Sequence, residues 1–186
     1  MSLTRIIQPI FASRRRALDK YQTQAEQLQM QVLHRLVNKA KDTEWGRNHG
    51  FASVSSYEDF AKTSDVNTYE ELKLAIDRMR QGESDILWPG KVRWYAKSSG
   101  TTNDKSKFIP VSKDGLKDTH YAGGRDAVTW YLRNNPQSRI FDGKALILGG
   151  SHVPNYNTKN SLVGDLSAIL IENINPLVNL VRVPKK

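Results

Sequence analysis

The fold of this chain is predicted from one stretch, which reads Ser98-Ser99-Gly100-Thr101-Thr102-Asn103-Asp104-Lys105-Ser106-Lys107-Phe108-Ile109-Pro110. Its first half is too small and too hydroxylated to form part of a core. Glycine lets the backbone approach a ligand closely, and consecutive N–H groups, hydroxyls and lysines can surround an anion. The stretch therefore predicts a binding loop for a phosphate-bearing ligand, of which a nucleoside triphosphate is favoured.

The residues on either side of this loop predict a hairpin. Residues 92–96 have the composition of a strand that enters the loop, and residues 107–111 that of a strand that leaves it. Runs of Ser, Thr and Gly also form plain surface loops, so this alternative stays open on composition alone. The stretch is not a Walker-type loop, because no glycine directly precedes a lysine that is followed by serine or threonine. Its placement between two strands favours the phosphate-binding interpretation.

Residues 98–110 resemble the phosphate-binding loop of the acyl-adenylate-forming superfamily. More narrowly, they resemble the Gretchen Hagen auxin-responsive family of acyl-acid amido synthetases, whose loop reads Ser-Ser-Gly-Thr-Thr/Ser, a few variable residues, lysine, two apolar residues and proline. The resemblance extends upstream to residues 43–51, 69–72 and 78–87, and downstream to residues 164–170. It therefore covers nearly the whole chain, and the loop is its most specific part.

The resemblance implies an α/β fold, namely the N-terminal part of the large domain of acyl-CoA synthetase- and luciferase-like enzymes, with a mixed sheet and flanking helices. Residues 1–186 are then expected to be one incomplete, ATP-binding domain that lacks the rest of the large domain and the small C-terminal domain. The family's adenine and ribose motifs and its catalytic lysine are not found before Lys186. Catalytic residues are therefore expected downstream of Lys186, and the chain alone is expected to be inactive.

The chemistry implied by the resemblance is that of a two-step ligase. A carboxylic acid reacts with ATP to give an acyl-adenylate and pyrophosphate, and the amine of an amino acid then displaces AMP. ATP and Mg²⁺ are the implied cofactors, and the acid and the amino acid are the implied partners. The residues implied to bind the ATP phosphates are Ser98, Ser99, Gly100, Thr101, Thr102, Lys105 and Lys107. Asp104 departs from the family pattern, which often has glycine there, and we expect it to point away from the nucleotide.

A glycine pair interrupts the helix that is predicted after the loop, from Ser112 as N-cap to about Arg133. Gly123 and Gly124 each cost helix stability, so they indicate either tight packing or open space beside a ligand. In the family this helix helps to line the acid site, which implies an acyl-substrate pocket at Gly123, Gly124 and Arg125. The alternative for Arg125 is an ordinary exposed side chain. Residues 149–151 are a second candidate for backbone contact with a ligand, because they follow an apolar strand predicted over residues 144–150.

The other predicted elements follow from local patterns. Apolar residues at spacings of three and four predict one long helix from Arg14 to Lys41 with Ser13 as its N-cap. Thr68 and Glu71 have the spacing of a capping box at the start of another helix. Residues 153–161 are polar and predict a mobile loop.

Composition leaves rival functions open. The net charge is +9, which favours anionic partners, but the basic and aromatic residues are too dispersed to predict specific nucleic-acid binding. The alternatives to an amido synthetase are an acyl-CoA ligase, a basic binding module and a truncated interaction domain.

There are no cysteines, and the N-terminal segment lacks the apolar run of a signal peptide or membrane span, so a cytoplasmic protein without membrane partners is expected. The histidines show no metal-ligand spacing and predict no metal held by protein ligands; they are His34, His49, His120 and His152. The acid, the amine and the oligomeric state stay open.

Overall fold

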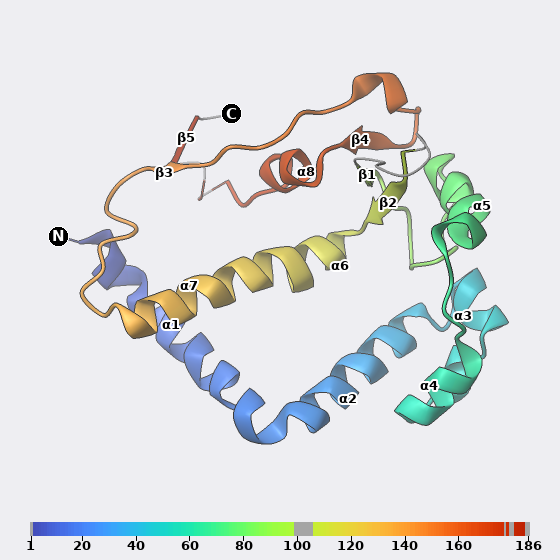
Figure 1. Ribbon diagram of the computed structural model, residues 1–186, viewed down its shortest axis with the longest axis horizontal. Helices are drawn as coiled ribbons and strands as arrows, with labels where there is room; N and C mark the ends of the chain where they lie inside the picture. Colours follow the sequence, from blue (N-terminus) through green and yellow to red (C-terminus); the bar gives the residue numbers. More distant parts are fainter. Residues whose placement is uncertain (1, 99–105, 177, 179–180, 185–186) are drawn as a thin grey trace.

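The computed structural model describes residues 2–98, 106–176, 178 and 181–184. Helices form most of it, together with a three-stranded and a two-stranded sheet (Figure 1). The helices are α1 (Leu3–Asp19), α2 (Tyr21–Ala40), α3 (Glu44–Asn48), η1 (Phe51–Ser53), α4 (Tyr57–Thr63), α5 (Tyr69–Arg80), α6 (Lys113–Gly115), the π-helical segment η2 (Leu116–Tyr121), α7 (Ala122–Asn134), η3 (Pro154–Tyr156) and α8 (Leu166–Glu172). The strands are β1 (Trp94–Lys97), β2 (Phe108–Val111), β3 (Ala145–Leu146), β4 (Leu162–Gly164) and β5 (Arg182–Val183).

The larger sheet has the strand order β2-β1-β4. β1 pairs with β2 in the antiparallel sense, with Trp94 opposite Val111, and with β4 in the parallel sense, with Trp94 opposite Leu162. The hairpin around the hydroxyl-rich loop is therefore confirmed, although β1 begins two residues later than the sequence indicates. The chain reaches β4 only after the long helical run α6–η2–α7 and the two-residue strand β3 (Figure 1). The expected mixed sheet with flanking helices is confirmed.

Both faces of the larger sheet are covered, because alternate residues of a strand point to opposite faces. On one face, the fully buried Tyr95 belongs to a cluster with Ile76 and Met79 of α5. On the other face, Ala96 belongs to a cluster with Ile169 of α8. β1 therefore contributes to two separate core clusters, one with α5 and one with α8.

The predicted helix over residues 14–41 is wrong at its start and in its continuity. The structure has two helices, α1 and α2, which meet at an angle after Lys20 (Figure 1). Ser2 rather than Ser13 is the N-cap of α1, and its hydroxyl accepts a hydrogen bond from the Arg5 N–H at 3.4 Å. The two helices bury different surfaces, since α1 packs along α7 whereas the end of α2 packs on η1. One straight helix could not make both contacts, so the chain bends.

Two predicted caps are confirmed. The Thr68 hydroxyl accepts a bond from the Glu71 N–H at 3.5 Å, and the Glu71 carboxylate accepts one from the Thr68 N–H at 2.6 Å, which completes the capping box of α5. The Ser112 hydroxyl accepts a bond from the Gly115 N–H at 3.0 Å at the start of α6. From there α6, η2 and α7 continue as one helical run to Asn134 (Figure 1).

The predicted buried strand over residues 144–150 is wrong in length and burial. Only Ala145 and Leu146 form a strand, β3, and within the described residues it pairs only with β5. Leu146 is 69% exposed and Leu148 is 81% exposed. The apolar run is typical of a strand covered on both faces, whereas here the side chains of Leu146 and Leu148 are largely exposed.

The predicted mobile loop over residues 153–161 is attached to the end of α5. The Thr158 hydroxyl donates to the Arg80 carbonyl at 3.0 Å, and the Asn160 side-chain amide donates to the Gln81 carbonyl at 2.6 Å. These bonds satisfy carbonyl groups that the last turn of a helix leaves free. The polar composition of the segment therefore reflects capping of α5.

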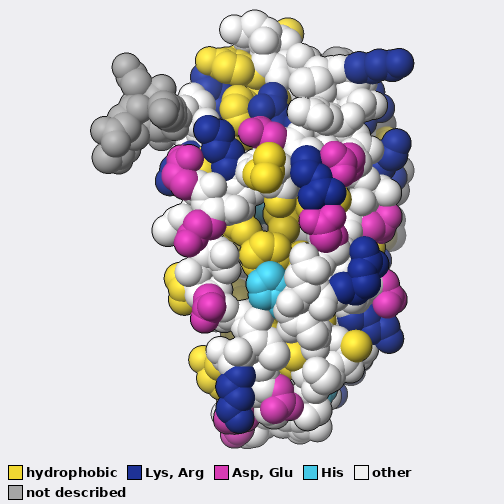
Figure 2. Space-filling view, turned by 90° about the vertical axis from the view of Figure 1, so that its right-hand side faces the viewer, with side chains coloured by type: hydrophobic (Ala, Val, Ile, Leu, Met, Phe, Trp, Pro, Cys, Tyr) yellow, Lys and Arg dark blue, Asp and Glu magenta, His cyan; other side chains and the backbone are white. Residues whose placement is uncertain are grey.

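Charged side chains of both signs are interspersed on the face that carries α3, α4 and α5 (Figure 2). A cavity of about 310 Å³ among these helices is lined by Trp45, Phe51, Phe60 and Leu72 among others. The positive charge of the chain is not concentrated on this face, which does not have the basic surface that nucleic-acid binding requires. None of the helices in the described part of the chain has the length and hydrophobicity needed to cross a lipid bilayer.

Asp142 ties the start of α1 to the segment that follows α7. Its Oδ1 accepts hydrogen bonds from the Thr4 N–H at 3.0 Å and from the Ser2 hydroxyl at 2.9 Å, and its Oδ2 accepts one from Arg139 Nε at 2.7 Å. These bonds, that of the Thr4 backbone foremost, hold the pKa of Asp142 well below its ordinary range. The charged form of Asp142 therefore stabilises the folded protein.

Asp142→Asn is expected to lower the melting temperature at pH 7. Because the folded pKa of Asp142 is depressed, the stability contributed by the carboxylate is present above the unfolded pKa of about 3.9 and is lost as the pH falls through the folded pKa. The difference in melting temperature between the two proteins should therefore shrink below about pH 4. Thermal unfolding at a series of pH values measures this. Glu26→Gln, at an exposed position on α2, is the control. A difference for Asp142→Asn that persists unchanged at low pH would contradict the assignment.

Candidate functional site

The ends of the hydroxyl-rich loop are fixed by the hairpin. Ser98 follows β1 and Lys107 precedes β2. The Ser98 N–H donates to the Lys107 carbonyl at 2.9 Å, and the Lys107 N–H donates to Ser98 Oγ at 3.2 Å. Of the residues predicted to bind phosphate, the structure thus places Ser98 and Lys107 side by side at the base of the loop. The other predicted phosphate-binding residues lie outside the described part of the chain; they are Ser99, Gly100, Thr101, Thr102 and Lys105. Asp104 also lies outside it.

Two lysines lie at the base of the loop, each over an aromatic ring. The Nζ of Lys107 is 5.5 Å from the centre of the Tyr69 ring, and the Nζ of Lys97 is 4.2 Å from the centre of the Tyr156 ring. The Tyr69 hydroxyl also accepts a hydrogen bond from the Phe108 N–H at 2.9 Å, which fixes the ring beside β2. The sequence prediction missed Lys97, although its place directly before Ser98 could have indicated it.

A cavity of about 410 Å³ opens beside Ser98, on the face of the sheet that carries α6 and α8. Ile109 and Val111, two residues apart on β2, contribute apolar side chains from the sheet, and Leu166 of α8 contributes another. His120 of η2 adds an imidazole to the lining, whereas the Lys97 ammonium lies over Tyr156, on the face of β1 that carries Tyr95. The cavity thus combines an apolar wall with a hydrogen-bonding side chain near Ser98, which suits a molecule with an apolar body and a polar end such as a carboxylate.

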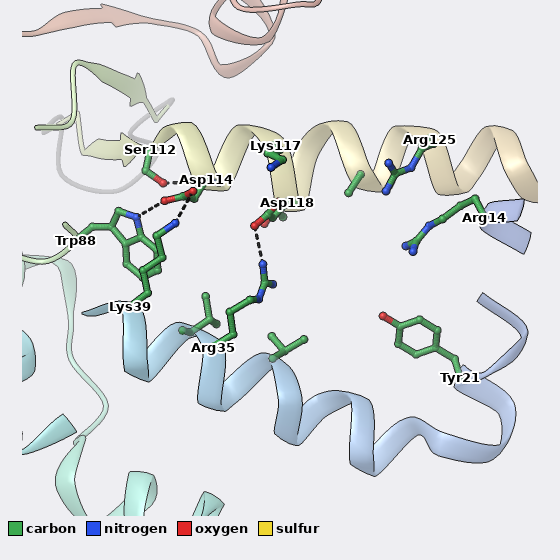
Figure 3. Close-up of a pocket in the computed structure, with 15 residues that line it drawn as sticks. Arg14, Tyr21, Arg35, Lys39, Trp88, Ser112, Asp114, Lys117, Asp118 and Arg125 are labelled. Carbon is green, nitrogen blue, oxygen red and sulfur yellow. Dashed lines mark hydrogen bonds and ion pairs between the residues drawn. The ribbon is translucent and has the colours of Figure 1, made fainter. Parts of the chain in front are cut away.

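The glycine pair on α7 lies in open space. Among the described residues, no atom of another part of the chain lies within 4 Å of the position that a Cβ would occupy on Gly123 or Gly124. The glycine pair therefore does not serve tight packing, and the interpretation that it leaves open space beside α7 agrees with the structure. Arg125 points elsewhere, into a second cavity between α7 and the α1–α2 pair (Figure 3). The structure does not bring these three residues together into the cavity beside Ser98.

Gly124→Ala is expected to raise the free energy of unfolding by about 0.5–1 kcal/mol, because it removes the helix penalty of glycine at a position without neighbours. Gly46→Ala is the matched control with the opposite sign. A Cβ on Gly46 would overlap the Ala40 carbonyl, so we expect a loss of roughly 1–3 kcal/mol. Urea unfolding of both variants measures the two changes. A loss of stability in Gly124→Ala would show that α7 is packed on that side.

The glycines at residues 149–150 serve packing. A Cβ on Gly150 would overlap the Asp165 side chain, and a Cβ on Gly149 would overlap Ile171. The Asp165 carboxylate also accepts a hydrogen bond from the Ser151 N–H at 2.8 Å. These glycines therefore allow the chain to pass closely over α8. Close packing explains the glycine pair without a ligand.

His49 packs against the body of the protein. Its ring stacks on Trp45 with the centroids 4.0 Å apart, and its Nδ1 is 2.9 Å from the Trp45 carbonyl oxygen. In the part of the chain that the structure describes, no group of three or more His, Asp or Glu side chains could hold a metal ion.

Comparison with protein families gives the identity of the fold. Residues 14–181 match the model described as the GH3 family N-terminal domain. The chain belongs to the GH3 family. This is the auxin-responsive family that the sequence resembles, so the resemblance is confirmed as family membership.

Relatives within the GH3 family are much longer than this chain. Indole-3-acetic acid-amido synthetase GH3.6 of Arabidopsis thaliana is 28% identical over 95 residues, which cover 50% of this chain and 16% of that protein. Jasmonoyl--L-amino acid synthetase JAR4 of Nicotiana attenuata is 24% identical over 123 residues, which cover 66% of this chain and 21% of that protein. The chain therefore matches about a fifth or less of the length of these GH3 proteins.

A solved GH3 structure has the same fold. AtGH3.15 acyl acid amido synthetase in complex with 2,4-DB superimposes with a TM-score of 0.72 at 20% sequence identity, covering 90% of this chain and 28% of that one. The α/β architecture expected from the resemblance, with a mixed sheet and flanking helices, is thereby confirmed for this GH3 chain.

Proposed function

We propose that this GH3 chain supplies the ATP-binding loop and part of the acid-binding site of a ligase that joins a carboxylic acid to an amino acid. Family membership supports the reaction class, because the relatives named above are amido synthetases. The observation that carries the proposal is that Ser98, at the root of the loop, lines the cavity of about 410 Å³. A phosphate group in the loop and an acid in that cavity would be neighbours, as the transfer between them requires.

The reaction would proceed in two steps. The carboxylate oxygen of the acid attacks the α-phosphorus of ATP, a new P–O bond forms, and pyrophosphate leaves. The amine nitrogen of the amino acid then attacks the acyl carbon, the C–O bond to AMP breaks, and the nitrogen loses a proton. Only the first step involves the residues of this chain that we place in the site.

The role of the loop residues is electrostatic. Ser98 Oγ accepts its hydrogen bond from the Lys107 N–H, so its own hydroxyl proton is available to a phosphate oxygen. Lys107 and Lys97 supply positive charge where negative charge develops on the phosphates. Ser99, Gly100, Thr101, Thr102 and Lys105 are proposed to complete the phosphate site by their hydroxyls, backbone N–H groups and charge.

The acid is proposed to lie with its apolar body against Ile109 and Leu166. His120 would then face its carboxylate. Gly123 and Gly124 leave room on the next turn of the helix and are retained as candidate neighbours of a larger acid. Arg125 is not retained, because it lines the other cavity.

Mg²⁺ is proposed to enter as the complex with ATP, held by the phosphate oxygens. The described residues offer no cluster of acidic side chains that could hold the ion by themselves. We also propose a cytoplasmic location, where ATP and amino acids are available.

The test uses the native gene product, with its intact mass measured and its coding sequence read beyond Lys186. ATP–pyrophosphate exchange is measured against a panel of carboxylic acids, and the products with amino acids and with coenzyme A are identified by mass spectrometry. We expect exchange that depends on an acid, followed by an amide product. A thioester product would instead indicate an acyl-CoA ligase, and the absence of exchange with every acid would overturn the proposal.

A further inference from the structure

The second cavity has a volume of about 570 Å³ and lies between α1 and α2 on one side and α6, η2 and α7 on the other (Figure 3). This volume is in the range of small-molecule sites, roughly 300–1,000 Å³. The side chains of Arg14, Arg125 and Tyr21 lie toward one end of the cavity, and those of Trp88 and Lys39 lie at the other (Figure 3).

One end of the cavity is closed by ion pairs. Lys39 Nζ is 2.7 Å from Asp114 Oδ1, and Trp88 Nε1 donates to Asp114 Oδ2 at 2.9 Å. A turn further along, Arg35 is 2.6 Å from Asp118. The hydrogen bond from Lys39, together with that from Trp88, lowers the pKa of Asp114. These contacts hold α2 against α6 and η2, and they occupy the acidic groups that line the cavity.

The other end keeps a cationic group that is not fully used. Arg14 takes both oxygens of Asp126, at 2.6 and 2.7 Å. The nearby Arg125 reaches the same carboxylate only at 3.8 Å and is half exposed. The lining contains five cationic side chains against two carboxylates, and at this end Arg125 is the cation that has no close carboxylate of its own.

The wall between the two ends is apolar. Val32 and Leu36, four residues apart on α2, and Ala122 at the start of α7 all line the cavity. Val32 is 41% exposed and Leu36 is 43% exposed, although both face α7 across the cavity. Exposed apolar side chains inside a concave site gain stability when an apolar group covers them.

We propose that this cavity binds a small organic anion, whose apolar body packs on Val32 and Leu36 and whose carboxylate or phosphate group is held by Arg125. A free inorganic anion would leave the apolar wall uncovered, and an uncharged hydrophobic molecule would leave Arg125 without a close anionic partner. The site is separate from the cavity beside Ser98, and its lining shares only Ser112 and Gly115 with it. Binding there would bridge α2 and α7 and so stabilise the N-terminal helices against the rest of the chain.

The test titrates octanoate and octyl phosphate into the ¹⁵N-labelled chain, with octanol as the uncharged control of the same length. The indole N–H of Trp88, assigned by comparison with Trp88→Phe, reports on the cavity because it donates to Asp114. We expect saturable shifts of this signal with one or both anions and much smaller shifts with octanol. Binding of octanoate alone or octyl phosphate alone identifies the preferred acidic group. Equal shifts with octanol, or no shift with either anion at millimolar concentration, would overturn the proposal.

Two arginines of α7 provide the matched variants. Arg125→Gln removes a guanidinium from the cavity, whereas Arg133→Gln removes one that pairs with Asp19 outside it. Hydrogen bonds to charged groups are worth about 1.5–3 kcal/mol, so Arg125→Gln is expected to weaken binding about tenfold or more and Arg133→Gln to leave it unchanged. An equal effect of the two variants, or shifts that centre on Ile109 and His120, would place the anion elsewhere. The titration contains no ATP, so its result does not depend on the ligase proposal.

Discussion

Ile169→Ala is expected to cost the protein about 2–5 kcal/mol of unfolding free energy. Ile169 has no exposed surface and packs from α8 into the cluster that contains Ala96, Val111 and Leu116. Removing its outer carbons loses the transfer energy of a buried side chain and leaves a cavity in a close-packed core. Domains are typically stable by roughly 5–15 kcal/mol, so this change removes a large part of the total.

Urea unfolding followed by far-ultraviolet circular dichroism measures the loss. Ile109→Ala is the matched control, because Ile109 lies on the sheet face against which Ile169 of α8 packs but is 45% exposed at the cavity beside Ser98. We expect a change below about 1 kcal/mol for Ile109→Ala. If the two variants lost equal stability, α8 would not be the cover of this face.

The parts of the fold that the sequence predicted depend on neighbouring residues. The capping box of Thr68 and Glu71 and the N-cap at Ser112 require side chains three residues apart, and both were predicted at the correct positions. The hairpin around residues 98–107 was predicted because strand-forming residues flank a run that can only be a loop. In each case the chemistry that fixes the structure lies within a few residues along the chain.

The parts that it did not predict depend on contacts between distant segments. The bend after Lys20 arises because α1 packs on α7, more than a hundred residues away, while α2 packs on η1. The apolar run over residues 144–150 has the pattern of a buried strand, but burial needs covering elements that a pattern within the run cannot reveal. Periodicity therefore identified the apolar faces correctly and gave no information about what covers them.

The candidate site shows the same division. Ser98 and Lys107 were predicted, because the motif is contiguous. His120 and Leu166 were missed, because they reach the cavity only when η2 and α8 fold back over the sheet. The period of two along β2 does place Ile109 and Val111 on one face, which was the available signal for the apolar wall.

Lys107→Gln is expected to weaken the binding of Mg-ATP by the native gene product about 10- to 150-fold. The factor corresponds to the loss of one charge-assisted hydrogen bond, worth about 1.5–3 kcal/mol. The Lys107 side chain is exposed and lies over the Tyr69 ring, while its backbone closes the loop through bonds that glutamine keeps. The folded structure should therefore be preserved, with a change in stability within roughly 0.5 kcal/mol.

Equilibrium dialysis against Mg-ATP, with thermal unfolding run in parallel, measures both quantities. Lys91→Gln is the control, since it removes the same charge from an exposed position just before the opposite end of β1. If only the general positive charge of the protein attracted Mg-ATP, the two variants would bind it equally weakly, because both lower the net charge by one. If the loop is a specific phosphate site, Lys107→Gln binds Mg-ATP weakly and Lys91→Gln binds it about as tightly as the parent protein. The same comparison at higher salt separates them further, because a distant exposed charge is screened whereas a direct contact is screened much less.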